Sequence, residues 1–168
     1  IAEKANSEGI ETLPEFFTYN LSNKIKDKYS KAIAITANNV FAHADDLLGI
    51  LSGVKNLLCD NGIFVFEVSY LVDVYQKTLF DTIYHEHLSY HSIKPLFSFF
   101  KRNEMKLIDV KRVETHGGSI RCVAQLSKGN IEENKSVNEL IKLEEKLKID
   151  TLDTWLKYSN KVKKVGDN

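Results

Sequence analysis

The sequence has few of the features that mark secreted or membrane proteins. Its two cysteines, Cys59 and Cys122, lie far apart and outside any paired metal-ligand spacing, which predicts two reduced thiols rather than a structural disulfide. No apolar run approaches the roughly 20 residues needed to cross a bilayer, and the first residues lack the basic-then-apolar order of a signal peptide. These absences predict a cytoplasmic protein without a membrane partner.

The chain also lacks an excess of charge of either sign. Lysine and arginine together number 23, as do aspartate and glutamate, so no overall field attracts nucleic acid. A hydrophobic content of 43% over 168 residues is enough for a packed core. We therefore expect a globular protein whose partner is a small molecule and not a nucleic acid.

Methionine is nearly absent as well. The sequence begins at Ile1 and has Met105 as its single methionine, and residues 1–8 have the pattern of a helix that ends at Gly9. A charged helical pattern runs toward the other end of the chain. We expect from these observations that the sequence is a piece of a longer protein.

Strand and helix patterns alternate along the middle of the chain. The compact apolar run Lys31–Ala37 predicts a strand buried on both faces, and Ile63–Val68 predicts a second one. Between them, Ala44–Leu58 carries leucines at helical spacing, and Asn61-Gly62 is expected to close that helix. This order is a βαβ unit, so the two strands should be parallel.

Further elements flank this unit. A short strand is expected at Ile10–Leu13, and helices are expected at Phe16–Ile25, Leu71–Leu79 and Ile93–Asn103. Lys106–Glu114 and Ser119–Leu126 predict an antiparallel pair at the edge of the sheet, joined through Gly117-Gly118.

Beyond Ser127 the leucines return to helical spacing among many charged residues. This pattern predicts two amphipathic helices that leave the domain. The fold class is therefore α/β: an incomplete Rossmann-like sheet of parallel strands with a C-terminal antiparallel pair, followed by helices. We expect residues 1–127 to belong to the sheet domain and residues 128–168 to form a helical connection to a further domain.

The densest group of polar functional side chains is Tyr84-His85-Glu86-His87. A histidine exchanges protons near neutral pH, and a neighbouring carboxylate can orient it, so the group is a plausible acid/base set. Capping or surface roles are the alternative, which clustering disfavours. A metal site that includes His91 is a weaker alternative, because the helical His-Glu-x-x-His spacing is missing.

Three polar residues elsewhere are further candidates. Asn39 and His43 lie four residues apart just after the first buried strand, so one helical turn would bring both to the same face. They could hold a ligand, or they could simply end the strand and precede the next helix. His116, before Gly117-Gly118, is either part of a tight turn or close to a ligand.

Four ordered motifs now indicate a family. Asn39–His43, Gly62–Val68, Phe80–His87 and His116–Ser119 together resemble C-methyltransferases that alkylate carbon 3 of nucleotide-linked 4-keto-deoxysugars. The resemblance implies a class I methyltransferase sheet that uses S-adenosylmethionine. The alternatives are a class I methyltransferase that methylates the oxygen of another small molecule, and an inactive fragment that lacks the cofactor loop. It also implies that the glycine-rich cofactor loop, a zinc-binding domain and a C-terminal sugar-binding domain lie outside this sequence, so zinc is expected only in that missing N-terminal domain.

The resemblance also implies roles for individual residues. His87 resembles the general base that removes the proton beside the ketone, assisted by Tyr84 and Glu86. Asn39, His43 and His116 resemble substrate-binding positions, and Asn38 is expected to bind the cofactor. The sequence departs from the family pattern at two positions, with Ser69 in place of proline and His91 in place of an aromatic residue.

Overall fold

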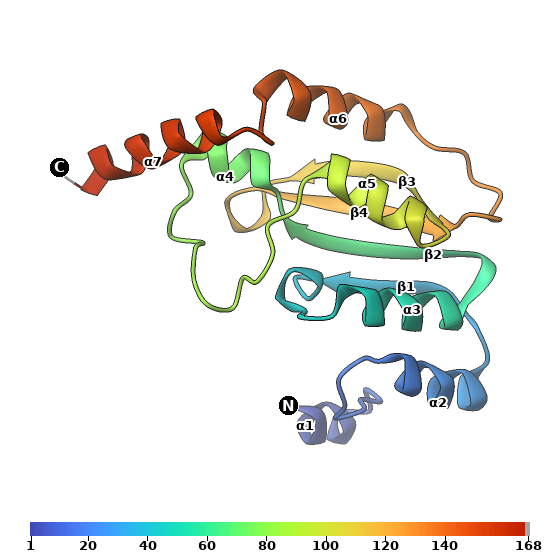
Figure 1. Ribbon diagram of the computed structural model, residues 1–168. Helices are drawn as coiled ribbons and strands as arrows, with labels where there is room; N and C mark the ends of the chain where they lie inside the picture. Colours follow the sequence, from blue (N-terminus) through green and yellow to red (C-terminus); the bar gives the residue numbers. More distant parts are fainter. Residues whose placement is uncertain (167–168) are drawn as a thin grey trace.

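A four-stranded sheet forms the centre of the computed structural model, which describes residues 1–166 (Figure 1). The strands are β1 (Ala32–Asn38), β2 (Leu58–Ser69), β3 (Met105–Val113) and β4 (Ser119–Leu126), and they lie in the order β1-β2-β4-β3. β1 and β2 are parallel, whereas β4 runs antiparallel to both of its neighbours. The expected α/β sheet, parallel strands finished by an antiparallel pair, is thus confirmed.

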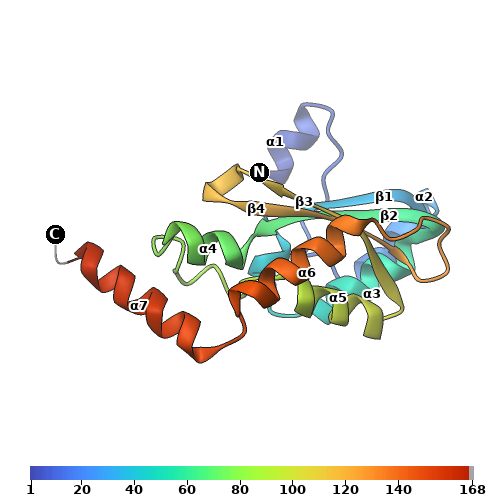
Figure 2. The ribbon, with the colours of Figure 1, turned by 90° about the horizontal axis from the view of Figure 1, so that it is seen from above.

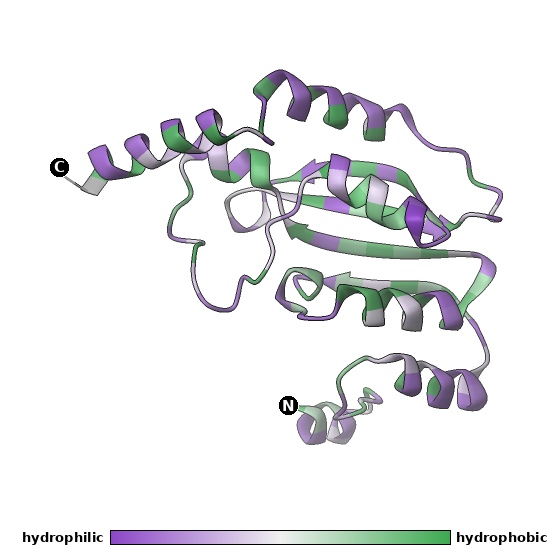
Figure 3. Cartoon of the chain, viewed as in Figure 1, coloured by the Kyte–Doolittle hydropathy of each residue, from purple (hydrophilic) through white to green (hydrophobic). Residues whose placement is uncertain are grey.

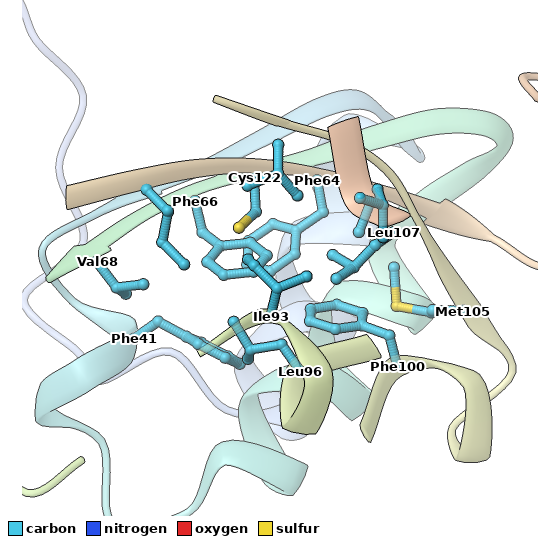
Figure 4. Packing of buried hydrophobic residues seen from close by; sticks show 14 of the residues in the cluster. Phe41, Phe64, Phe66, Val68, Ile93, Leu96, Phe100, Met105, Leu107 and Cys122 are labelled. Carbon is cyan, nitrogen blue, oxygen red and sulfur yellow. The ribbon is translucent and has the colours of Figure 1, made fainter. Parts of the chain in front are cut away.

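Helices cover one face of this sheet. Figure 2 shows α3 (Leu47–Leu57) and α5 (Ile93–Arg102) on the same side of the strands. Between them and the sheet lies an apolar core in which Phe66 of β2 and Phe100 of α5 are stacked with ring centroids 5.4 Å apart (Figure 4). Figure 3 shows that β2 is largely apolar. Burial of these aromatic rings contributes to the apolar contact that stabilises the fold.

β1 does not match the prediction of a strand buried on both faces. It lies at the edge of the sheet. Ile35 and Ala37 pack against the core, whereas Ala34 and Thr36, which alternate onto the opposite face, are exposed, and Ile33 near the start of the strand is 78% exposed. An apolar run has the same composition whether one or both of its faces are packed, so the pattern could not separate these two cases.

The N-terminal segment also differs from its prediction. Ile10–Leu13 forms no strand, because no neighbouring strand among residues 1–166 offers it backbone partners. It is tied instead to α1 (Ala2–Ser7) by hydrogen bonds between Asn6 and Thr12 of 2.8 and 2.9 Å. α2 (Tyr19–Tyr29) begins later than expected, because the Thr18 hydroxyl caps it by accepting the Leu21 N–H.

Asn61-Gly62 does not close α3, as the pattern had suggested. The helix ends at Leu57, and β2 starts directly at Leu58 with an irregularity in its pairing to β1 around residues 59–62. A side chain at Gly62 would come within 2.9 Å of the Ala32 carbonyl oxygen, so the glycine allows β1 and β2 to approach each other there.

The C-terminal helices have different environments. α6 (Lys135–Leu147) was expected to leave the domain, but it packs against β3 and α5, where Val137 and the Glu144 side chain are buried. α7 (Leu152–Gly166) extends past α4 (Leu71–Lys77), as Figure 1 shows. A domain boundary after residue 127 stays a prediction. Among residues 1–166, none of the helices combines the length and the apolar character that a membrane crossing requires.

Candidate active site

A cleft of about 380 Å³ lies at the carboxyl ends of β1 and β2. In open α/β sheets this is the end where ligands bind, because the loops that follow the strands converge there. Its walls come from the 3-10 helix η1 (Phe41–His43), the end of β2, the loop between α4 and α5, and the 3-10 helix η2 (Thr115–Gly117). The lining residues are Asn39, Ala42, His43, Val68, Ser69, Asp81, Thr82, Tyr84, His87 and His116.

We call the segment between α4 and α5, residues 78–92, the site loop. Within it, half-buried His87 lies with its Nδ1 atom 2.7 Å from the backbone carbonyl oxygen of Thr82. A carbonyl oxygen accepts hydrogen bonds but cannot donate them, so Nδ1 carries the proton. The neutral ring therefore has an unprotonated Nε2 atom, which is the form that a general base requires.

His43 of η1 is held in the same manner. Its Nδ1 atom lies 2.7 Å from the backbone carbonyl oxygen of Glu86, so its Nε2 atom is likewise the unprotonated one in the neutral ring. The His43 and His87 ring centroids are 4.9 Å apart. The fold thus pairs two imidazoles, from positions 43 and 87, in one cleft.

The other two members of the predicted catalytic set differ in position. The Tyr84 ring packs against His87, with centroids 4.5 Å apart, and it lines the cleft while remaining 44% exposed. The Glu86 side chain is exposed and is not among the lining residues, although its carbonyl orients His43. Tyr84 is therefore placed to reach a substrate directly, whereas the carboxyl group of Glu86 lies outside the cleft.

Asn39 and His116 meet across the cleft although 77 residues separate them. The Asn39 side-chain amide lies 3.2 Å from His116 Nε2. Both residues have left-handed backbone angles, with φ of 53° and 51°, which turn the chain sharply after β1 and within η2. Asn38, the predicted cofactor residue, is the exposed last residue of β1 and does not line this cleft.

A buried carboxylate organises the wall around His116. Glu67, at the end of β2, is 5% exposed and accepts hydrogen bonds from the Thr115 hydroxyl at 2.5 Å and from the Arg121 guanidinium at 2.8 and 3.0 Å. The Thr115 hydroxyl, and then the Arg121 guanidinium, lower the pKa of Glu67. The carboxylate therefore stays charged and holds the turn that carries His116.

The remaining histidines do not add a metal site. The His91 ring is 7% exposed and packs beside Phe41, with ring centroids 5.8 Å apart, so it belongs to the core rather than to a ligand set. Within residues 1–166, no three His, Cys, Asp or Glu side chains gather in a way that could hold a metal ion.

Asp81 and Thr82 both line the cleft, although the motifs did not single them out as site residues. Thr82 acts on His87 through its backbone carbonyl, which every residue type possesses, so no side-chain signal could have revealed it. Asp81 lies inside the motif Phe80–His87, and its polar side chain was the one available signal.

Comparison with known proteins relates the chain to a family of enzymes. Residues 114–168 match a family model described as the C-methyltransferase C-terminal domain. Over 141 residues, which are 84% of the chain, the sequence is 36% identical to C-methyltransferase NovU of Streptomyces niveus. The chain matches the C-methyltransferase family over part of its length. It spans 34% of the length of NovU. The resemblance indicated by the four motifs is confirmed at the level of C-methyltransferases.

A solved structure agrees with this match in its fold. The chain is similar to a SAM-dependent methyltransferase from Anabaena variabilis, with a TM-score of 0.51 and 11% identity over 69% of this chain and 58% of that one. At so low an identity the likeness shows a shared fold alone. The chain thus shares its α/β sheet architecture with that protein.

Proposed function

We propose that this chain supplies the base and the substrate cleft of an S-adenosylmethionine-dependent C-methyltransferase acting on a nucleotide-linked 4-keto-deoxysugar. The observation that carries the proposal is the His87 imidazole, which lines the cleft with Nδ1–H bound to the Thr82 carbonyl. Methylation at carbon requires a carbon nucleophile. A base with a free Nε2 atom beside a keto sugar would generate one, because the ketone acidifies its neighbouring carbon.

The cleft residues divide the chemistry between them. His87 Nε2 takes the proton from the carbon beside the ketone, and the electron pair left behind delocalises onto the ketone oxygen as an enolate. Tyr84 can donate a hydrogen bond to that developing charge, since its ring lies against His87 in the same cleft. Asn39, His43 and His116 orient the sugar.

The cofactor would supply the methyl group, and Asn38 is the residue of this chain that would contact it. Bound S-adenosylmethionine would supply an electrophilic methyl group, which leaves its sulfur as the enolate carbon forms the new carbon–carbon bond. Asn38 ends β1 with an exposed amide that can both donate and accept hydrogen bonds, which fits one polar contact with such a molecule. The comparison with NovU supports methyl transfer to carbon, the activity in that protein's name.

The test is a pair of substitutions in the complete protein, assayed with S-adenosylmethionine and a nucleotide-linked 4-keto-deoxysugar. His87→Ala should lower kcat by about 10²- to 10⁴-fold, the usual contribution of a general base. His85→Ala is the matched control: this neighbouring side chain is exposed and does not line the cleft, so kcat should stay within about twofold.

Product analysis completes the test. We expect the new methyl group on carbon, and we expect wild-type protein in D₂O to exchange the proton beside the ketone faster than the His87→Ala variant does. Unchanged turnover in His87→Ala, or a methyl group found on oxygen, would contradict the proposal, since O-methylation needs no carbon acid.

A further inference from the structure

The Thr82 carbonyl oxygen accepts two hydrogen bonds, and the second one comes from Tyr90. The Tyr90 hydroxyl lies 2.7 Å from this oxygen, the same distance as His87 Nδ1. A carbonyl oxygen has two lone pairs, so the two donors use its full capacity. We propose that Tyr90 is a positioning residue for His87, because its hydroxyl fixes the carbonyl that keeps the imidazole in the Nδ1–H form.

Tyr90 is suited to this task because its own backbone is tied to the core. On one side of it, the Ser89 N–H donates to the Ala42 carbonyl at 3.2 Å. On the other side, the His91 carbonyl accepts the Leu71 N–H at 2.9 Å. Tyr90 therefore leaves the site loop at a point held by η1 and by the start of α4.

The turn around Thr82 is held mainly by its own loop. The Thr82 hydroxyl donates to the Leu79 carbonyl at 2.9 Å, and the Ile83 N–H donates to the Phe80 carbonyl at 3.1 Å. Such local bonds define a turn but do not tie it to the sheet. The Tyr90 hydroxyl links this turn to a residue whose neighbours are hydrogen-bonded to η1 and α4. It therefore fixes the carbonyl that orients His87 relative to the core.

The surroundings of Tyr90 keep its hydroxyl a donor. The side chain is half-buried, and its ring meets the His87 ring edge-on with centroids 6.0 Å apart. Burial raises the pKa of the Tyr90 hydroxyl above its ordinary value, so the proton that it donates stays in place at neutral pH. The contact thus persists under the conditions in which His87 would act.

The chain offers a matched control in Tyr158 of α7. This side chain is 6% exposed, and its hydroxyl has no hydrogen-bond partner within the described part of the chain. Its ring lies 6.5 Å from the ring of Tyr75 in α4, centroid to centroid, and burial raises the pKa of its hydroxyl as it does for Tyr90. Tyr158→Phe therefore removes a buried hydroxyl without removing a bond to Thr82.

The first experiment reads the tautomer of His87 directly. In the complete protein labelled with ¹⁵N-histidine, long-range ¹H–¹⁵N spectra should show His87 with its proton on Nδ1. Tyr90→Phe should change the ratio of the two tautomers by about 3- to 10-fold toward Nε2–H, the range expected for one neutral hydrogen bond. Tyr158→Phe should leave the ratio within about twofold. An unchanged ratio in folded Tyr90→Phe would overturn the inference.

The second experiment separates positioning from binding. This inference rests on the proposed function, because it assigns how the base of that reaction is held. In the methyl-transfer assay Tyr90→Phe should lower kcat about 3- to 10-fold with KM within about twofold. If the wild type transfers no methyl group, the proposed function fails, but the tautomer spectra still test the Tyr90 contact.

A third measurement applies if Tyr90→Phe does not fold. In the wild type, the Tyr90 hydroxyl proton and the His87 Nδ1 proton point at the same oxygen, so they should show a nuclear Overhauser contact. The hydroxyl proton should also exchange slowly with water. Absence of that contact in the folded wild type would overturn the inference.

Discussion

Two walls of the cleft, the turn that carries His116 and the site loop, are fixed by different kinds of contact. The His116 turn, residues 114–119, is held by a buried carboxylate, because Glu67 accepts a hydrogen bond from the Thr115 hydroxyl. Asp73, which is 2% exposed, lies close to Gly118. Lys77 adds a hydrogen bond to the Gly117 carbonyl at 2.7 Å. Buried charge-assisted contacts of this kind are among the stronger ones in proteins, so this wall is preorganised.

The site loop is held by neutral hydrogen bonds to backbone carbonyls. His43 binds the Glu86 carbonyl and Tyr90 binds the Thr82 carbonyl, while Phe80 and Leu88 are 43% and 52% exposed. Neutral hydrogen bonds contribute roughly 1 kcal/mol each. In the proposed reaction, the more firmly held His116 turn would receive the substrate, and the more weakly held site loop would carry the base.

The largest expected effect comes from filling the space at Gly118. Its φ of 145° is a glycine conformation, and an added Cβ would come within 2.4 Å of Asp73. Gly118→Ala should lower the free energy of unfolding by about 3–5 kcal/mol, through backbone strain and the clash together. Urea unfolding measures this. Gly9→Ala is the control: its φ is also positive, but no atom lies within 4 Å, so about 1 kcal/mol is expected.

A loss for Gly118→Ala as small as that of the control would mean that the His116 turn is not rigid, and the contrast between the two walls would disappear.

A smaller effect should appear at acid pH, where the site loop joins the core. Burial lowers the pKa of His91 to about 4, and a hydrogen bond to the Phe41 backbone opposes this shift. The folded state then binds fewer protons than the unfolded one, so stability falls as pH falls from about 6.5 to about 4. From about 1.4 kcal/mol per pKa unit, the loss is about 3 kcal/mol.

His91→Phe should remove this loss, because a phenyl ring has no proton to gain. Unfolding free energies of wild type and variant, measured by urea titration at pH 7 and pH 4.5, should differ in their pH dependence by about 2–3 kcal/mol. His85→Phe, at an exposed position of the same loop, should keep the wild-type dependence. If the unfolding free energies of wild type and His91→Phe fell equally between pH 7 and pH 4.5, His91 would not anchor the loop in its neutral form.

The smallest effect is expected for an exposed side chain of the loop. Leu88→Ser replaces an apolar group that is 52% exposed, so the free energy of unfolding should change by less than about 0.5 kcal/mol. Thermal unfolding followed by circular dichroism measures the difference. A loss above about 2 kcal/mol would show that the loop is packed as firmly as the His116 turn.

The residue pattern predicts helices and strands correctly where the side chains themselves carry the information. The leucines of α3 and the apolar residues of β2 predicted a strand, helix and strand in parallel order, as the structure has them. It failed at β1, where Ile33 is exposed, and at residues 10–13, because packing partners and not composition decide those features. It also misjudged α6, whose Glu144 accepts hydrogen bonds from the Ile93 and Lys94 N–H groups at the start of α5.

The sequence by itself determined the order of elements and the grouping of Tyr84, Glu86 and His87, since periodicity and clustering can be read directly from residue types. Only the tertiary structure brought Asn39 to His116 and His43 to His87, because sheet topology, not spacing, joins positions so far apart. It also decided which nitrogen of His87 carries the proton. The carbonyl that sets this tautomer belongs to the backbone, and a backbone carbonyl is identical at every position of a sequence.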